Sequence, residues 1–103
     1  MNNIKLSIDE IKDFISDANE DALVLDNLDD AIIGVAHRNN MNTVIAYDKN
    51  KIIEMYVKDG MSDEEAEEFF WYNTHGSWMG DGTPIFVEIM RDTNKTSMKI
   101  ISQ

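Results

Sequence analysis

The 103-residue chain contains no cysteine and a single proline. Without cysteine it can form no disulfide, no thiolate metal site and no thiol nucleophile. No apolar run approaches the roughly 20 residues needed to cross a bilayer, and the N-terminus lacks the charged-then-apolar order of a signal peptide. We therefore expect a chain that folds by packing alone, resides in the cytoplasm and does not act on a membrane.

Basic residues are also scarce, with 9 Lys and Arg against 20 Asp and Glu and a formal net charge of −11. Affinity for nucleic acid comes largely from basic side chains that replace counterions, so we expect no direct binding to nucleic acid. The acids gather in residues 1–30, which hold nine, and in residues 59–68, which hold six and no base. Both blocks are interleaved with apolar residues, which predicts acidic faces on folded helices.

Three helix starts are marked by capping residues. The capping boxes Ser7-Ile8-Asp9-Glu10 and Ser62-Asp63-Glu64-Glu65 predict helices over about 8–18 and from 63 to Asn73, the second with an inward stripe of Ala66, Phe69, Phe70 and Asn73. Asp48 is a candidate N-cap for a helix over 49–58, which Gly60 would end. The last two helices then form an αα-hairpin.

Strand-forming runs occupy 31–36 and 43–47, separated by a polar, Asn-rich stretch at 37–42 that predicts a β-hairpin turn. A third run, 84–90, is almost continuously apolar, which favours a buried strand, and Lys99–Ile101 could add a frayed final strand. We predict one domain over 1–103, with 91–103 a frayed extension. The fold class is α+β, a small, mainly antiparallel sheet packed by an N-terminal helix and a central αα-hairpin.

Residues 29–88 resemble a family of small acidic proteins found in phages, prophages and bacteria, usually without an assigned function. The most specific stretch is GMSDEEAEEFFWYN at 60–73, followed by Gly82-Thr83-Pro84-Ile85. The recurrent polar features of that family map onto Asn73, Gly80, Gly82 and Pro84. The resemblance implies a genomic setting and no mechanism.

Sites for chemistry are hard to assemble from this sequence. His37 and His75 are the only imidazoles and lack zinc-motif spacing, and no serine stands in a nucleophile-elbow context. The EF-hand-like opening at 17–21 lacks the glycine and glutamate that calcium needs, although a looser divalent site on Asp26, Asp29 and Asp30 stays open. We predict no enzyme activity, no cofactor and no metal.

The stretch 69–80 is the most informative part of the chain. Four consecutive aromatics cannot all face one core on a helix, so part of this surface is covered by the loop 76–83 or free for a partner. One interpretation puts Phe69 and Phe70 in the core, with Trp71, Tyr72 and Trp78 packing that loop onto the helix. The other is a partner-binding surface of Trp71, Tyr72, Trp78, Met79, Glu64, Glu67 and Glu68, with Asn73, His75, Gly80 and Gly82 as loop or ligand candidates.

Three functions are compatible with these features. The first is a non-enzymatic, phage- or prophage-type protein that inhibits or modulates a host or defence protein, with nucleic-acid mimicry as a variant. The second is a protein that sequesters a small molecule such as a nucleotide, which would need His75, Arg38 or Arg91 to converge on a phosphate. The third is a structural or regulatory subunit that uses the aromatic patch as a homodimer interface.

Overall fold

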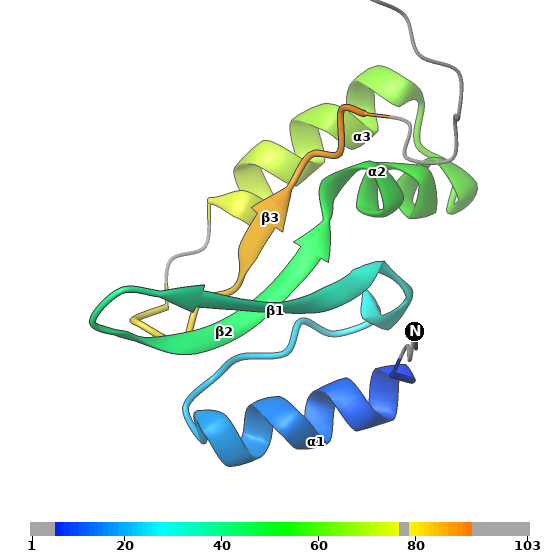
Figure 1. Ribbon diagram of the computed structural model, residues 1–103. Helices are drawn as coiled ribbons and strands as arrows, with labels where there is room; N and C mark the ends of the chain where they lie inside the picture. Colours follow the sequence, from blue (N-terminus) through cyan, green and yellow to red (C-terminus); the bar gives the residue numbers. More distant parts are fainter. Residues whose placement is uncertain (1–5, 77–78, 92–103) are drawn as a thin grey trace, which may run out of the picture.

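The computed structural model describes residues 6–76 and 79–91 and has the predicted α+β class. Its elements, drawn in Figure 1, are α1 (Ile8–Ala18), a 3₁₀ turn η1 (Asp29–Ala31), β1 (Ile32–Arg38), β2 (Met41–Asp48), α2 (Lys49–Lys58), α3 (Asp63–Phe69), a π-helical segment η2 (Phe70–His75) and β3 (Ile85–Val87). No helix in the described ranges is long and apolar enough to cross a membrane.

The helix starts follow from local hydrogen bonding. The hydroxyls of Ser7 and Ser62 each accept the third backbone N–H of their helix, and Glu10 and Glu65 accept the cap N–H in return. The Asp48 carboxylate accepts the N–H of Lys51. These contacts satisfy amides that lack an intrahelical partner, and the predicted bounds of α1 and α2 are confirmed.

The sheet is mixed, with strand order β1-β2-β3. β1 and β2 are antiparallel and extend further than predicted, because only Asn39 and Asn40 form the turn, and Asn40 has the positive φ of 59° that asparagine tolerates. β3 pairs parallel to β2 and comprises only three residues of the predicted run 84–90. The predicted buried position is wrong: among the described residues β3 is a half-buried edge strand, and its Phe86 packs against the core. The predicted strand at Lys99–Ile101 lies outside the described residues.

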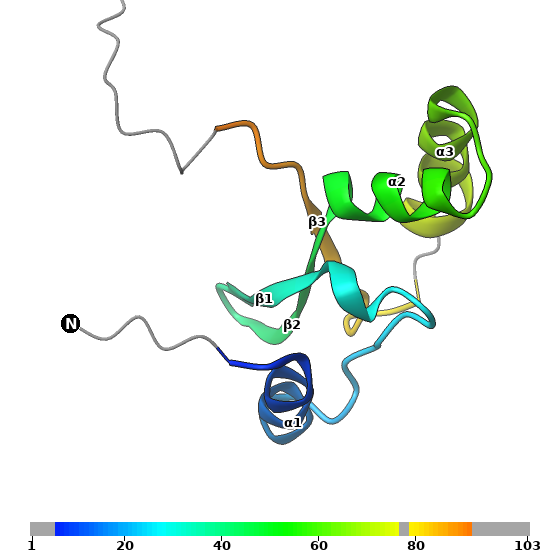
Figure 2. The ribbon, with the colours of Figure 1, turned by 90° about the vertical axis from the view of Figure 1, so that its right-hand side faces the viewer.

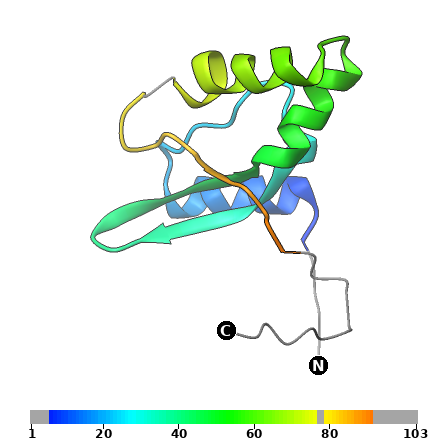
Figure 3. The same ribbon diagram turned by 90° about the horizontal axis from the view of Figure 1, so that it is seen from above.

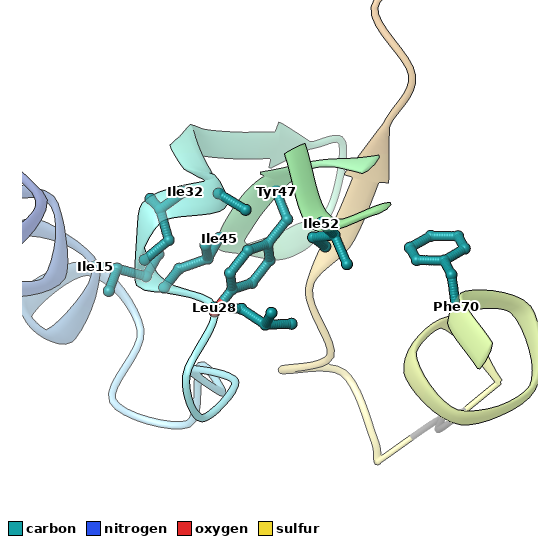
Figure 4. Packing of buried hydrophobic residues seen from close by; sticks show 8 residues of the cluster. Ile15, Leu28, Ile32, Ile45, Tyr47, Ile52 and Phe70 are labelled. Carbon is teal, nitrogen blue, oxygen red and sulfur yellow. The ribbon is translucent and has the colours of Figure 1, made fainter. Parts of the chain in front are cut away.

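Helices pack on both sides of the hairpin. Figure 2 shows α1 on one side of β1 and β2 and the α2–α3 pair on the other, and Figure 3 shows α2 and α3 meeting at an angle. The core runs between them from Ile15 of α1 to Phe70 of η2, with Tyr47 of the central strand in between (Figure 4). The Tyr47 hydroxyl accepts the N–H of Leu25, so the loop after α1 is fixed to the sheet.

Candidate protein-binding surface

The aromatic run begins inside the core and leaves it within two residues. Phe70 is fully buried, Trp71 is 46% exposed and Tyr72 is 76% exposed. The helix widens here from α3 into the π-helix η2, which takes more residues per turn than the α-helix predicted through Asn73. Because the winding changes, the side chains of successive aromatic residues point in directions that an α-helix would not give them. π-helical turns occur frequently at functional sites.

Of the four residues predicted to face inward from this helix, two are buried and two are not. Ala66 and Phe70 are buried, whereas Phe69 and Asn73 are exposed. Phe69 packs edge-on against Tyr56 of α2, with ring centroids 5.1 Å apart, at the periphery of the helix pair. The interpretation that places Phe69 in the core and packs Tyr72 under the loop is accordingly wrong, because Tyr72 projects into solvent.

Five of the seven predicted partner-binding residues lie around one shallow depression of about 440 Å³, which we call the acidic–aromatic surface. Their spacing of i, i+3, i+4, i+7 and i+8 along α3 and η2 brings them to one side of the helix. The five are Glu64, Glu67, Glu68, Trp71 and Tyr72.

A buried lysine, Lys49, contacts Glu67 and Trp71 of this surface from the protein interior. Lys49, the first residue of α2, is only 8% exposed, and its Nζ lies 2.6 Å from Glu67 Oε2 and 3.4 Å from Glu88 Oε1. The same Nζ lies 5.3 Å from the centroid of the Trp71 ring, within cation–π range. One ammonium group therefore connects α2, α3, η2 and the segment after β3.

Trp71 is held from several sides. Its indole N–H donates to Glu67 Oε2 at 3.2 Å, and its ring packs edge-on against Phe70 and against His75, with centroids 5.1 and 4.8 Å apart. A half-exposed tryptophan fixed in this way loses little conformational entropy when a partner covers it. Tyr72 extends the same surface further into solvent.

The hydrogen bonds around Glu67 shift the pKa values of Glu67 and Lys49. The Lys49 ammonium, followed by the Trp71 indole N–H, lowers the pKa of Glu67 from its ordinary value of 4.5. The hydrogen bond to Glu67 raises the pKa of Lys49 from 10.5, against an opposing effect of desolvation. Both groups are therefore charged throughout the neutral range, and Glu67 contributes less free negative charge to the surface than Glu64 or Glu68.

Replacing Glu67 by glutamine is expected to make stability less dependent on acidic pH. Because the folded-state pKa of Glu67 is lowered, its ionisation stabilises the fold above about pH 4.5, and this contribution is lost as pH falls through the lowered pKa. The urea midpoints of the wild type and Glu67→Gln should thus differ most at neutral pH and converge in acid. Glu64→Gln is the matched control, since Glu64 forms no ion pair within residues 6–76 and 79–91. An unchanged difference down to pH 2 would contradict the assignment.

The other predicted site residues that the structure describes lie on η2 or in the following loop. His75 is exposed and contacts Trp71, while Asn73 is exposed on η2. Met79 has an exposed side chain, and its N–H donates to Thr83 Oγ1 at 2.8 Å, but it does not line the depression. Trp78 lies outside the described residues.

The glycines of this loop have structural roles. Gly80 has a φ of +94°, and its carbonyl accepts both the N–H and the hydroxyl of Thr83. Gly82 is buried against the loop after α1: its carbonyl accepts the N–H of Leu23 at 3.0 Å, and a Cβ on it would overlap the Asp21 carbonyl oxygen. Gly82 therefore joins two distant segments and faces protein backbone.

The geometry supports neither the phosphate site that would use Arg38 nor the divalent-cation site on Asp26, Asp29 and Asp30. The Arg38 guanidinium donates to the carbonyls of Asn42 and Asp81, so it connects the hairpin to the loop. Asp29, one of the three aspartates of the possible divalent site, forms an ion pair with Lys12 at 2.7 Å. Within the described ranges, no three His, Asp or Glu side chains are grouped as a metal site would require.

Sequence reasoning missed Lys49. A lysine at the first position of an amphipathic helix is ordinarily solvated, and nothing adjacent to it in the sequence indicates burial. Its partners come from α3 and from the segment after β3, 18 and 39 residues away. Only the tertiary packing brings them together.

No protein-family model, no curated protein and no solved structure matches this chain.

Proposed function

We propose that this chain is a non-enzymatic binding protein that attaches to a basic surface of another protein through its acidic–aromatic surface and so inhibits or modulates it. The observation that carries the proposal is the convergence of three glutamates with the exposed Trp71 and Tyr72 around one depression. Exposed aromatics that anchor an interface and carboxylates that orient the partner are a frequent combination at protein interfaces.

The chemistry of this surface favours a cationic partner group. A lysine or arginine side chain placed in the depression would meet the face of an aromatic ring and one or two carboxylates at once. Glu67 is already paired with Lys49, so Glu64 and Glu68 are the carboxylates left to receive the cation. Trp71, fixed by Glu67 and His75, supplies a ring whose position is set before binding.

The class of target follows from the charge and from the family resemblance. Six acids and no base over 59–68 offer an anionic face of the kind that a nucleic-acid-binding groove accepts, so the mimicry variant belongs to this proposal. A host or defence protein with such a groove, in the cytoplasm of a bacterial cell, is the partner we propose.

Affinity capture with matched variants tests this function. The wild-type chain, immobilised and exposed to a bacterial lysate at about 50 and about 500 mM salt, should retain a defined partner more strongly at low salt, where charge is less screened. The double variant Glu64→Gln/Tyr72→Ala should weaken retention about tenfold or more, since it removes a carboxylate and the most exposed aromatic.

A charge-matched control separates this surface from overall acidity. Asp9→Asn, on the exposed side of α1, removes one acid away from the depression and should leave retention nearly unchanged. Equal losses for both variants would show that net charge alone governs binding. Retention by the wild type that neither salt nor the double variant weakens would refute the proposal.

A further inference from the structure

A second apolar surface lies between α1 and β1, and α1 packs on the side of the hairpin opposite to the α2–α3 pair (Figure 2). The surface is a groove of about 620 Å³ lined by Leu6, by Ile8, Ile11 and Phe14 of α1, and by residues 32–35 of β1. Leu6 is 50% exposed, and Phe14 and Ile33 are each 46% exposed. The α1–β1 groove is therefore a hydrophobic hollow that is open at the surface.

Two irregularities in β1 make this edge of the sheet unsuited to an added strand. In the described ranges β1 pairs with β2 alone. The register shifts between Ile32 and Gly34 and again between Ala36 and Arg38, which leaves only residues 34–36 in regular pairing. Such bulges bend an edge strand and interrupt the row of backbone groups that strand addition requires. Side chains, and not a ladder of backbone hydrogen bonds, therefore determine what the groove binds.

The groove has the length of about two helical turns. Residues 32–35 extend over about 10 Å of β1, at about 3.3 Å per residue. The distance along α1 from Ile8 to Phe14 is about 9 Å, at about 1.5 Å per residue. Apolar side chains at i, i+4 and i+7 of a helix span about 10.5 Å, so the apolar anchors of one helix match this length.

The charges beside the groove favour a basic partner. Glu10 and Asp17 lie one turn before and after Phe14 on α1, and neither forms an ion pair in the part of the chain that the structure describes. Lys12, the basic residue of α1, is already paired with Asp29 at 2.7 Å. Lysine or arginine at the border of a partner's apolar side is therefore attracted to α1.

From this geometry we infer that the α1–β1 groove binds a short amphipathic helix of another protein, whose apolar side enters the groove and whose lysine or arginine side chains face Glu10 and Asp17. A second copy of this chain fits less well, because the exposed faces of its α1 and α3 carry the same negative charge. The groove and the acidic–aromatic surface share no residue, so binding at one leaves the other free.

Titration of the full, isotope-labelled chain with a designed peptide tests the inference. The probe is an acetylated and amidated helix of about four turns, with leucine at the anchor positions and lysine at the others. It should shift the backbone amide NMR signals of Ile11, Phe14 and Ile33. The same peptide with glutamate in place of lysine should bind at least about tenfold more weakly, because its charge has the sign of α1.

Matched substitutions locate the binding site. Ile33→Lys places a charge in the groove and should weaken binding of the lysine peptide about tenfold, as should Phe14→Ala, which removes an anchor from the other wall. Ile89→Lys is the control, because Ile89 is 44% exposed and does not line the groove, and it should leave binding unchanged.

Three results would overturn the inference. The first is that the lysine peptide leaves the amide signals of the groove unmoved. The second is that a peptide of the same composition with its leucines scattered around the helix, or the glutamate peptide, binds the groove as tightly. The third is that Ile33→Lys and Ile89→Lys change binding equally.

Discussion

Replacing Gly82 by alanine is expected to destabilise the protein by about 3 kcal/mol, the upper range for overpacking a closed site. The added Cβ would overlap the Asp21 carbonyl oxygen and lie 2.9 Å from its carbonyl carbon. Both atoms belong to backbone, so no side chain can move aside to relieve the overlap. The loop must shift, and the Leu23 N–H then loses its hydrogen bond to the Gly82 carbonyl. Urea unfolding followed by tryptophan fluorescence measures this loss.

Gly60→Ala is the matched control for this substitution. Gly60 follows the C-cap of α2 with a φ of +116°, and a Cβ there meets no atom within 4 Å. Only backbone strain opposes the alanine, which costs about 1 kcal/mol. A Gly82→Ala variant no less stable than Gly60→Ala would contradict the close approach between the two loops.

Truncating Phe70 to alanine is expected to cost about 3 to 5 kcal/mol, the range for a large buried aromatic. Phe70 is fully buried, packs edge-on against Phe86 of β3 at 5.2 Å and lies beneath the Lys49 ammonium. Its removal leaves a cavity where η2, α2 and β3 meet. Thermal and urea unfolding should both show the loss.

Phe69→Ala provides the comparison within the same aromatic run. Phe69 is 38% exposed and packs edge-on against Tyr56, so its truncation should cost about 1 to 2 kcal/mol, in proportion to the smaller apolar area buried. Equal costs at the two positions would contradict the assignment of Phe70 alone to the core.

Local features of the sequence predicted the helices well. Two serine–glutamate capping boxes and one aspartate cap set three helix starts, because the hydrogen bonds involved connect residues only three positions apart. The antiparallel hairpin followed in the same way from two β-branched runs and an asparagine turn. These elements depend little on the rest of the chain.

Features that depend on distant segments were missed or misjudged. The apolar run 84–90 resembles a buried strand, yet β3 comprises three half-buried residues at the edge of the described sheet, and Phe86 alone of them packs its ring on Tyr47 and Phe70. The π-helical turn and the burial of Lys49 likewise arise where three elements meet. Five residues of the acidic–aromatic surface were predicted from the sequence, whereas the ion pair between Lys49 and Glu67 was not.

The parallel pairing of β2 with β3 has a consequence for the order in which the acidic–aromatic surface is assembled during folding. Ala46 and Ile85 are paired across 39 residues, whereas the β1–β2 hairpin closes over two, so the remote pairing carries the larger loop-closure entropy. The segment enclosed by that pairing contains α3 and η2, and Phe70 is packed directly against β3. The acidic–aromatic surface is therefore completed by a long-range pairing, which costs more loop-closure entropy than the β1–β2 hairpin does.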